Sequence, residues 1–396
     1  MKIAVIGGGA SGIAAAIAAR RNGASVTIYE GAERIGRKIL ATGNGRCNMT
    51  NMNADIGNYY GNNVAFMRDT IDTYWVMQTL AFFSELGILY KEEENGKVYP
   101  YSDRASSVLD VLRMCLDDEG VIVKTSFEVC DIKKEDTEFC ISSFKGQKEC
   151  ADQVIIACGG KAAPDLGTRG GGYELLKRFG HTITPLKPSL VQIKTDTEIV
   201  KKLKGIKINA KLMIGPNSES GEILFTEYGL SGPPVFSLSS RLDDHQVAAI
   251  DIFPHMSAEE LAGIVYTRMA LNPDRKLEEF FTGMINKRIG QAILKQLDIA
   301  PLSRCASDMS DVEVEKLIKT LKCWSFNIEG TMSWNNAQVT KGGADTREFN
   351  SKTMESLKQK GIYACGEILD IDGDCGGYNL QWAWSSGYIA GVSASE

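Results

Sequence analysis

Three glycines near the beginning of the chain have the spacing of a turn that binds the pyrophosphate of a dinucleotide. Gly7, Gly9 and Gly12 form a G-x-G-x-x-G pattern. The first glycine permits a tight turn, the second lets the backbone approach a phosphate, and the third brings a helix close to a strand. Amides at the helix start then face the phosphates, whose negative charge the helix dipole stabilises. The spacing therefore predicts a dinucleotide-binding turn.

The neighbouring residues predict the elements that such a turn requires. Residues 2–6 are apolar and partly β-branched, which is typical of a buried parallel strand. The alanine-rich stretch 10–22 predicts a helix, and residues 25–29 predict a second strand. Glu30 ends that strand, about twenty residues after the glycines, where a carboxylate can accept hydrogen bonds from ribose hydroxyls.

Two other interpretations of this stretch have less support. One is a glycine-rich turn in an unrelated α/β protein, but the strand, helix, second strand and terminal Glu30 all occur in the expected order. The other is a secretory signal peptide, because Lys2 precedes an apolar stretch. Glycines within that stretch, and the strand and acidic residue that follow it, argue against a signal peptide.

The composition excludes several classes of protein. A chain of 396 residues with 43% hydrophobic and 24% charged residues is typical of a globular protein with two or three domains. The net charge of -6 gives no basic surface, so we expect no nucleic-acid partner, and no apolar run is long enough for membrane insertion. The ten cysteines form no C-x-x-C pair and there are three histidines, so we expect no metal site and reduced thiols in a cytoplasmic protein.

The segment after the second strand has little periodicity but many groups that can bind a cofactor. Arg37 and Lys38 can reach a phosphate, and the glycines of GNGRCN at 43–48 let backbone amides contact a planar ligand. A solvated basic loop is the alternative interpretation. The position directly after a nucleotide-binding unit favours a cofactor loop.

Two later segments also combine strands with glycine or acidic turns. Residues 152–160 predict a buried strand that runs into a glycine turn, although a plain strand-to-loop transition is the alternative. Residues 361–365 predict a strand, followed by an acidic loop at 370–380 and a helix at 381–394. The loop begins D-x-D-G-D but lacks the closing Glu of an EF-hand, so we do not expect calcium.

The middle of the chain predicts helices and antiparallel strands. Residues 64–119 are mostly helical in pattern, and 121–144 predict three strands of a small meander. Period-two segments with turn residues at 189–252 predict an antiparallel sheet or barrel, which strands at 324–340 close. Residues 257–321 predict helices. His181 is expected at a helix end as a cap or surface residue.

The segments GRKILATGNGRCNMTN and GEILDIDGDCGGYNLQWAWSSGYIAG resemble the BaiN/RdsA family of FAD-dependent oxidoreductases, relatives of the aminoacetone-oxidase-like bacterial flavoproteins. The resemblance covers essentially the whole chain. It implies an α/β fold with a discontinuous Rossmann-like FAD-binding domain, similar to that of glutathione reductase, at 1–188 and 347–396. An inserted β-barrel or sheet domain is then expected at 189–256 and 322–346, with a helical insert at 257–321.

The resemblance also implies which residues contact FAD. Around the first turn and the loop after it, they are Gly7, Gly9, Ala10, Ser11, Gly12, Glu30, Arg37, Lys38, Gly43, Asn44, Gly45, Arg46, Cys47 and Asn48. Later in the chain, they are Val129, Ala157, Cys158, Gly159, Gly160, Gly366, Glu367, Asp370, Gly377, Tyr378, Asn379 and Leu380. Val129 is a candidate for a backbone contact to adenine by its position, and the start of the helix expected at 381–394 should point at the pyrimidine edge of the flavin.

The activity that the resemblance implies is reduction of an organic substrate of the conjugated C=C or enone type, with tightly bound FAD and NAD(P)H as a transient hydride donor. A second dinucleotide fingerprint is not visible, so NAD(P)H is expected to bind at the flavin face. The alternatives are an oxidase of small amines such as aminoacetone that uses O2, and an FAD-binding sensor without turnover. No residue is identified as the catalytic acid; Tyr378 and Arg46 are candidates, and Cys47 is expected to be a packed residue.

Overall fold

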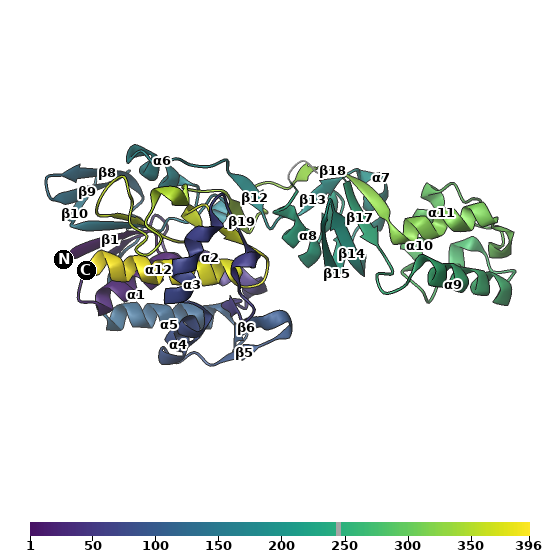
Figure 1. The fold of residues 1–396 in the computed structure, drawn as a ribbon, viewed down its shortest axis with the longest axis horizontal. Helices are drawn as coiled ribbons and strands as arrows, with labels where there is room; N and C mark the ends of the chain where they lie inside the picture. The colour runs from purple at the N-terminus through teal and green to yellow at the C-terminus, as the bar shows by residue number, and fades with distance from the viewer. Residues whose placement is uncertain (243–246) are drawn as a thin grey trace. The chain divides into compact units, whose positions relative to one another are not determined.

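The computed structural model describes residues 1–242 and 247–396 (Figure 1). It divides the chain into two compact units. Unit 1 contains residues 1–189 and 334–396, and unit 2 contains residues 190–333. The two ends of the chain therefore belong to the same unit, although the sequence of unit 2 separates them.

A five-stranded parallel sheet lies at the centre of unit 1. Its strand order is β20-β11-β1-β2-β7. The strands are β1 (Lys2–Ile6), β2 (Ser25–Tyr29), β7 (Ile122–Lys124), β11 (Gln153–Ile156) and β20 (Ile362–Ala364). Ile3, Val5 and Ile155 are almost completely buried, as expected for strands covered on both faces. This arrangement confirms the Rossmann-type fold that the first glycine turn predicted.

One strand was predicted in the wrong sheet. Residues 121–125 were expected to begin an antiparallel meander, but β7 pairs in parallel with β2, with Ile122 opposite Thr27. Helix α5 (Ala105–Asp118) precedes β7 and brings the chain back to the parallel sheet. β7 then joins this sheet at the edge formed by β2. The antiparallel sheet contains only the later strands β8 (Val129–Glu135), β9 (Glu138–Ser143) and β10 (Lys148–Ala151).

Two helices from opposite ends of the sequence pack together in unit 1 (Figure 1). They are α1 (Ala10–Arg21) and α12 (Tyr378–Ser395). A Cβ built on Gly391 of α12 would lie 2.2 Å from the carbonyl oxygen of Ala15, so the two backbones touch at this position. Five of the twelve residues of α1 are buried alanines, which also permit close packing. The C-terminal helix is therefore part of the dinucleotide-binding fold.

Smaller elements complete unit 1. Its other helices are α2 (Arg37–Ala41), α3 (Arg68–Thr73), α4 (Val76–Glu85) and α6 (Gly171–Arg178). Its short sheets are formed by β3 (Thr50–Asn51) with β6 (Lys97–Pro100) and β5 (Tyr90–Glu92), by β4 (Tyr59–Tyr60) with β21 (Asp372–Gly373), and by β12 (Lys187–Ser189) with β19 (Val339–Lys341).

Strand β19 lies in unit 1, whereas the sequence predicted it within the inserted β domain at 322–346. It pairs with β12, so the second connection between the units falls at residues 333 and 334. The Thr340 hydroxyl accepts hydrogen bonds from the amides of Lys161 and Ala162, at 2.7 and 3.0 Å. These contacts fix β19 to the loop after β11 and could not be seen in the local sequence pattern.

Unit 2 contains a closed barrel with the strand order β13-β16-β15-β14-β17-β18 (Figure 1). Its strands are β13 (Ile193–Thr195), β14 (Lys207–Ile214), β15 (Asn217–Phe225), β16 (Gly229–Ser231), β17 (Val247–Asp251) and β18 (Trp324–Thr331). Helices α7 (Thr197–Val200) and α8 (Pro233–Ser239) connect these strands. The barrel confirms the period-two pattern of this region.

Three longer helices interrupt the barrel between β17 and β18. They are α9 (Ala258–Leu271), α10 (Lys287–Gln296) and α11 (Asp311–Lys322). The Ser257 hydroxyl accepts from the Glu260 amide at 3.1 Å, which completes the capping box visible in the sequence. Leu261 and Leu317 share one buried cluster with Trp324 of the barrel. The helices are thus part of the same unit as the barrel.

No helix in the described parts of the chain is long and apolar enough to cross a membrane.

Candidate functional site

The first glycine turn has the geometry that its spacing predicted. Gly7 has a φ of +107°, which disfavours other residues. A Cβ on Gly12 would lie 1.9 Å from the Gly7 carbonyl oxygen, so the helix and strand are in direct contact. A Cβ on Gly9 would meet no atom within 4 Å. Open space therefore lies beside Gly9, at the start of a helix that has no side-chain cap within the described chain.

Glu30 is held at the end of β2 by the turn itself. Its carboxylate accepts hydrogen bonds from the amides of Gly8 and Ala32, both at 2.8 Å. A carboxylate can accept about four hydrogen bonds, so both oxygens keep acceptor capacity for ribose hydroxyls. Phe127, just before β8, donates its amide to the Glu30 carbonyl at 2.9 Å. This bond places Val129, the first residue of β8, near the same corner of the sheet.

The glycine turn after β11 lies beside the first turn. The Ala157 amide donates to the Ile6 carbonyl at 2.9 Å, and the Thr168 hydroxyl donates to the Cys158 carbonyl at 2.9 Å. A Cβ on Gly160 would lie 2.3 Å from the Thr340 hydroxyl oxygen and 2.7 Å from Oε1 of Glu367. The predicted residues Ala157, Cys158, Gly159 and Gly160 are thus brought together with Glu367.

Glu367 is the acidic residue at the carboxyl end of β20. One carboxylate oxygen lies 2.7 Å from Nζ of Lys38, and the other accepts from the Thr340 amide at 2.8 Å. The amide of Gly366 donates to the Ser386 hydroxyl at 2.9 Å, which ties this turn to α12. By contrast, Arg37 is turned away to donate to the Asp165 carbonyl at 2.7 Å. Of the two predicted basic residues, Lys38 reaches the acidic group.

The loop at 43–48 has an unusual backbone. Gly43, Asn44 and Gly45 have φ values of 56°, 55° and 81°, three successive residues in the left-handed region. Such a run exposes backbone groups on one side, which suits contact with a flat ligand. Asn48 accepts from the Val98 amide at 3.2 Å and so fixes the end of the loop to β6.

Arg46 anchors this loop to the rest of unit 1. Its guanidinium donates to the carboxylates of Glu93 and Asp103 and lies 4.0 Å from the centre of the Tyr99 ring. Hydrogen bonds to Glu93 and Asp103 raise the pKa of Arg46. These contacts give Arg46 a structural role, and its predicted contact with FAD stays a prediction.

Cysteines at the site are packed as neutral thiols. Cys47 and Cys365 are completely buried, and burial raises the pKa of each thiol to about 12. Burial raises the pKa of Cys158 to about 12 as well. A thiolate is the reactive form of cysteine, so these values favour packing over electron relay.

The start of α12 lies against the loop at 43–48. Gly377 has a φ of 102°, and a Cβ there would lie 2.5 Å from the Thr50 carbonyl and 3.0 Å from Oδ1 of Asn48. The side chain of Asn379 accepts from the Gly373 amide and donates to the Gly373 carbonyl, both at 2.8 Å. The carbonyl of Tyr378 accepts from the Tyr59 hydroxyl at 3.0 Å, and Leu380 is half-buried. The helix start is therefore held by hydrogen bonds to neighbouring segments, and it has no side-chain cap within the described chain.

Asp370 and the overlooked Asp372 are both buried in the acidic loop. Asp370 accepts from the Asn62 amide at 3.2 Å, and burial raises its pKa. Oδ1 of Asp372 has no hydrogen-bond partner among the described residues, and burial raises the pKa of Asp372 to about 7. In the sequence, Asp372 stood out only as part of the D-x-D-G-D pattern, which partly matches a calcium-binding loop. Its burial depends on pairing between β21 and β4, which local sequence does not indicate.

His181 is not the cap or surface residue that the sequence suggested. Its ring is buried, stacked on Phe349 at 4.3 Å, with Nε2 2.7 Å from the Ser356 hydroxyl and Nδ1 3.2 Å from the Glu348 carboxylate. Burial lowers the pKa of His181. The partners come from residues far along the chain, so the local pattern could not reveal them.

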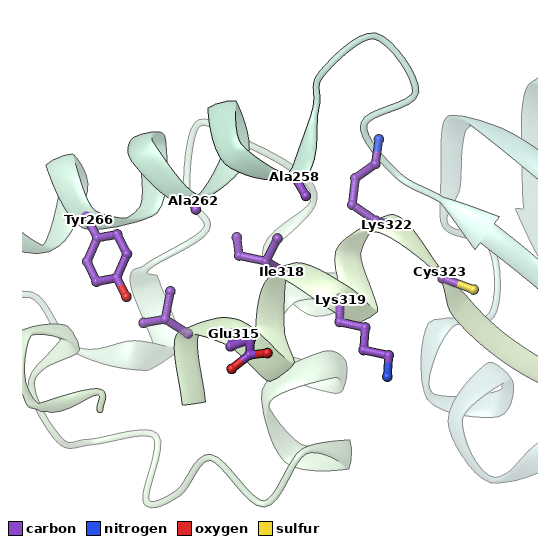
Figure 2. A pocket seen from close by; sticks show the side chains of 9 residues that line it. Ala258, Ala262, Tyr266, Glu315, Ile318, Lys319, Lys322 and Cys323 are labelled. Atoms are coloured by element: carbon purple, nitrogen blue, oxygen red, sulfur yellow. The ribbon is translucent and has the colours of Figure 1, made fainter. Parts of the chain in front are cut away.

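An open groove lies elsewhere, between α9 and α11 of unit 2 (Figure 2). Its volume is about 520 Å³. It is lined by Ala258, Ala262, Tyr266, Val314, Glu315, Ile318, Lys319, Lys322 and Cys323, which include none of the predicted site residues. Lys322 is already paired with Asp251 at 2.8 Å. The arrangement of chemical groups in unit 1 therefore defines the candidate site.

The residues of unit 1 fit FAD. The space beside Gly9 and the uncapped start of α1 suit a pyrophosphate, and Glu30 suits a ribose. Glu367 is placed for hydroxyl groups, and the uncapped start of α12 for the negative edge of a flavin. When bound, FAD supplies hydride and electron transfer, while the protein positions it and excludes water.

A Rossmann-type sheet with these two glycine turns and a returning C-terminal helix defines an FAD-dependent oxidoreductase. The family model described as the HI0933-like protein Rossmann domain matches residues 1–393. The chain belongs to this family, and the resemblance to BaiN/RdsA proteins is confirmed.

Curated relatives match the chain along its whole length. It is 40% identical to the 3-dehydro-bile acid delta(4,6)-reductase of Clostridium scindens, with 100% of this chain and 99% of that protein covered. It is 31% identical to the ribosomal RNA dihydrouridine synthase of Haemophilus influenzae, with 99% and 98% covered. A solved 3-ketosteroid-delta4-(5alpha)-dehydrogenase from Rhodococcus jostii is 14% identical, with 100% and 96% covered and a TM-score of 0.49.

Proposed function

We propose that the enzyme uses NAD(P)H to reduce a carbon–carbon double bond conjugated with a carbonyl group in a small organic substrate. The observation that carries this proposal is the 40% identity, over the whole chain, to a protein named as a delta(4,6)-reductase of a 3-dehydro-bile acid. The site in unit 1 supports it, because its polar groups fit a flavin, which can pass a hydride from a nicotinamide to such a bond.

The donor in this proposal binds at the flavin itself. Unit 2 consists of a barrel and helices, and within residues 190–242 and 247–333 no parallel strand pair supports a second dinucleotide turn. NAD(P)H and the substrate would therefore use the same face in turn. Such alternation leaves no need for a permanent nicotinamide site.

The residues of unit 1 have separate roles in the proposal. Glu30 and the turn at Gly9 hold the ADP half of FAD, and Glu367, oriented by Lys38, accepts hydrogen bonds from hydroxyls of the linking chain. The loop at 43–48 supports the ring system. Amides at the start of α12 stabilise negative charge on the reduced ring, by about 0.3–2 kcal/mol for a helix N-terminus.

Reduction of uridine in ribosomal RNA is the second candidate. The observation in its favour is the 31% identity to a protein named as a ribosomal RNA dihydrouridine synthase. Dihydrouridine differs from uridine by two hydrogens across a double bond conjugated with a carbonyl, so both candidates share one chemistry. The net charge of -6 favours the small substrate, because RNA binding relies on cationic side chains.

Anaerobic stopped-flow absorbance tests the proposal in two steps. NADH or NADPH should bleach the FAD-loaded enzyme, and a 3-keto-4,6-diene steroid acid should then restore the yellow colour. Restoration by an unmodified ribosomal RNA transcript, and not by the steroid, would select the second candidate. Bleaching by aminoacetone, with no response to either nicotinamide, would contradict both.

A further inference from the structure

Two cysteines face each other across neighbouring strands of the antiparallel sheet in unit 1. Strands β9 and β10 run side by side (Figure 1), and Cys140 lies directly opposite Cys150 in their register. Side chains of directly opposite residues point to the same face of a sheet. Both cysteines are free thiols. The fold therefore brings two free thiols together on one face.

The backbone at this pair already has the spacing of a disulfide. The Ser143 amide donates to the Gln147 carbonyl at 2.9 Å, which makes these two residues a hydrogen-bonded pair. Hydrogen-bonded and non-hydrogen-bonded pairs alternate along antiparallel strands, so Cys140 and Cys150, three pairs further on, form a non-hydrogen-bonded pair. The Cα atoms of such a pair are about 4.5 Å apart, within the range of about 4.4–6.8 Å that a disulfide spans. A bond between the two sulfur atoms therefore requires little movement of the strands.

The thiols lie on the outer face of the sheet. Cys150 is exposed and Cys140 is half-buried, whereas the neighbouring residues Phe139 and Ile141 point the other way and are completely buried. A small reagent can therefore reach the pair, and a bond there leaves the core in place. Burial, and then the nearby Cys140 thiol, raise the pKa of Cys150. A raised pKa slows the reaction of a thiol, so the equilibrium rather than the rate is the quantity to measure.

The other cysteines do not have this arrangement. Within the paired strands of the described chain, no other cysteine faces a cysteine. The Cys130 thiol of β8 donates instead to the Ser142 carbonyl at 3.4 Å, and Cys47 and Cys365 are completely buried. Cys323 of unit 2 is exposed and has no cysteine opposite it. It therefore serves as an accessible single thiol for comparison.

We propose that Cys140 and Cys150 form a redox site, which a small disulfide oxidises reversibly to an intrachain disulfide. The thiolate of one cysteine attacks the small disulfide, whose S–S bond breaks, and one small thiol leaves. The second cysteine then attacks the mixed disulfide, which forms the intrachain S–S bond and releases the second small thiol. The two cysteines lose two electrons and two protons in total, and the small disulfide gains them. This inference does not depend on the proposed function.

Peptide mapping of the FAD-loaded full chain tests the site directly. The reduced protein is equilibrated with glutathione disulfide, its remaining thiols are blocked with N-ethylmaleimide in denaturant, and it is digested with trypsin without reduction. Cleavage after Lys145 and Lys148 places Cys140 in the peptide 135–145 and Cys150 in the peptide 149–161. The two peptides should be recovered as one linked species. Cys158, which also lies in the second peptide, should carry N-ethylmaleimide.

Single substitutions supply the matched controls. Cys150→Ser should lose the linked species and should carry glutathione on Cys140. Cys130→Ser removes a thiol of the same sheet that faces no cysteine, and it should form the link as the wild type does. Cys323 should carry glutathione in all three proteins. The wild-type link should be half-formed at roughly tenfold less glutathione disulfide than half-modifies Cys323, because its second step is intramolecular.

Several outcomes would overturn the proposal. They are glutathione on Cys140 or Cys150 of the wild type without a link, no reaction of either cysteine while Cys323 reacts, and a link between Cys130 and Cys140 in place of the expected one. A link that dithiothreitol does not reduce in the folded protein would overturn its reversibility. The mapping uses the wild type, so the test stands even if a variant does not fold. Failure of either nicotinamide to bleach the enzyme would overturn the proposed function and leave this result unaffected.

Discussion

A Cβ built on Gly387 of α12 would lie 2.3 Å from the carbonyl oxygen of Ser11 in α1. The next glycine on the same face, Gly391, has the same relationship with Ala15 at 2.2 Å. The first residues of α1 follow the turn that is predicted to bind phosphate, and α12 begins at the predicted flavin edge. Direct backbone contact between the helices therefore fixes the distance between the two ends of the cofactor site.

Replacement of Gly387 by alanine should destabilise unit 1 and weaken FAD binding together. The clash is with backbone, which cannot rotate away, and overpacking of this kind typically costs about 1–3 kcal/mol of unfolding free energy. The measurements are urea unfolding, followed by hydrogen exchange in peptides of α12, and FAD titration of the FAD-free protein. Gly171→Ala in α6 is the matched control, because a Cβ there meets no atom within 4 Å. Equal stabilities of the two variants would contradict the packing argument.

Glu30→Gln should lower the affinity for FAD by roughly 10- to 100-fold. The variant keeps one acceptor oxygen but places an NH2 group against an amide of Gly8 or Ala32, and it loses charge-assisted bonds worth about 1.5–3 kcal/mol each. Calorimetric titration of FAD into FAD-free protein gives the dissociation constant. Glu33→Gln removes the same charge from an exposed position three residues later and should bind FAD like the wild type. An unchanged affinity in Glu30→Gln would disprove the ribose role.

The sequence predicted those features that depend on residues close together in the chain. Gly7, Gly9 and Gly12 specify a turn through their own backbone freedom, and the Ser257 capping box lies within one helical turn. Pairing between distant segments was not predictable in this way. β7 was expected in a meander because its own pattern suits any half-buried strand, and only its partner β2 determines the sheet.

The same limit explains which chemical groups were overlooked. The burial of His181 depends on Phe349 and Ser356, and that of Asp372 on a two-residue strand paired with β4. In each case the sequence supplies the titratable group, while its environment comes from residues more than a hundred positions away. A resemblance to a family can suggest the cofactor, but it does not reveal which acids the fold leaves without partners.

Removal of the Arg46 guanidinium should change how unit 1 responds to acid. Hydrogen bonds from Arg46 and Lys91 hold the pKa of Glu93 and of Asp103 below their usual values. Carboxyl groups with lowered pKa stabilise the fold above their unfolded pKa, near 4.5 and 3.8, and this contribution is lost as pH falls through the folded pKa. Arg46→Gln should therefore have a flatter acid limb in urea unfolding below about pH 5. An acid limb as steep as that of the wild type would contradict this role of the ion pairs.

In the FAD-free protein, Asp372→Asn should be more stable than the wild type at neutral pH. Burial raises the pKa of Asp372 from 3.8 to about 7. Below the unfolded value both states are protonated, so the shift has no effect. Between the two values only the folded state holds the proton, and stability falls as pH rises, until the full penalty is present above the folded pKa. Three pKa units correspond to at most about 4 kcal/mol of unfolding free energy.

Asparagine cannot ionise, so the difference in unfolding free energy between Asp372→Asn and the wild type should grow from acid to neutral pH. Urea unfolding, with hydrogen exchange in α12, measures this difference. A difference that is constant over this range would show that Asp372 does not hold its proton in the folded state.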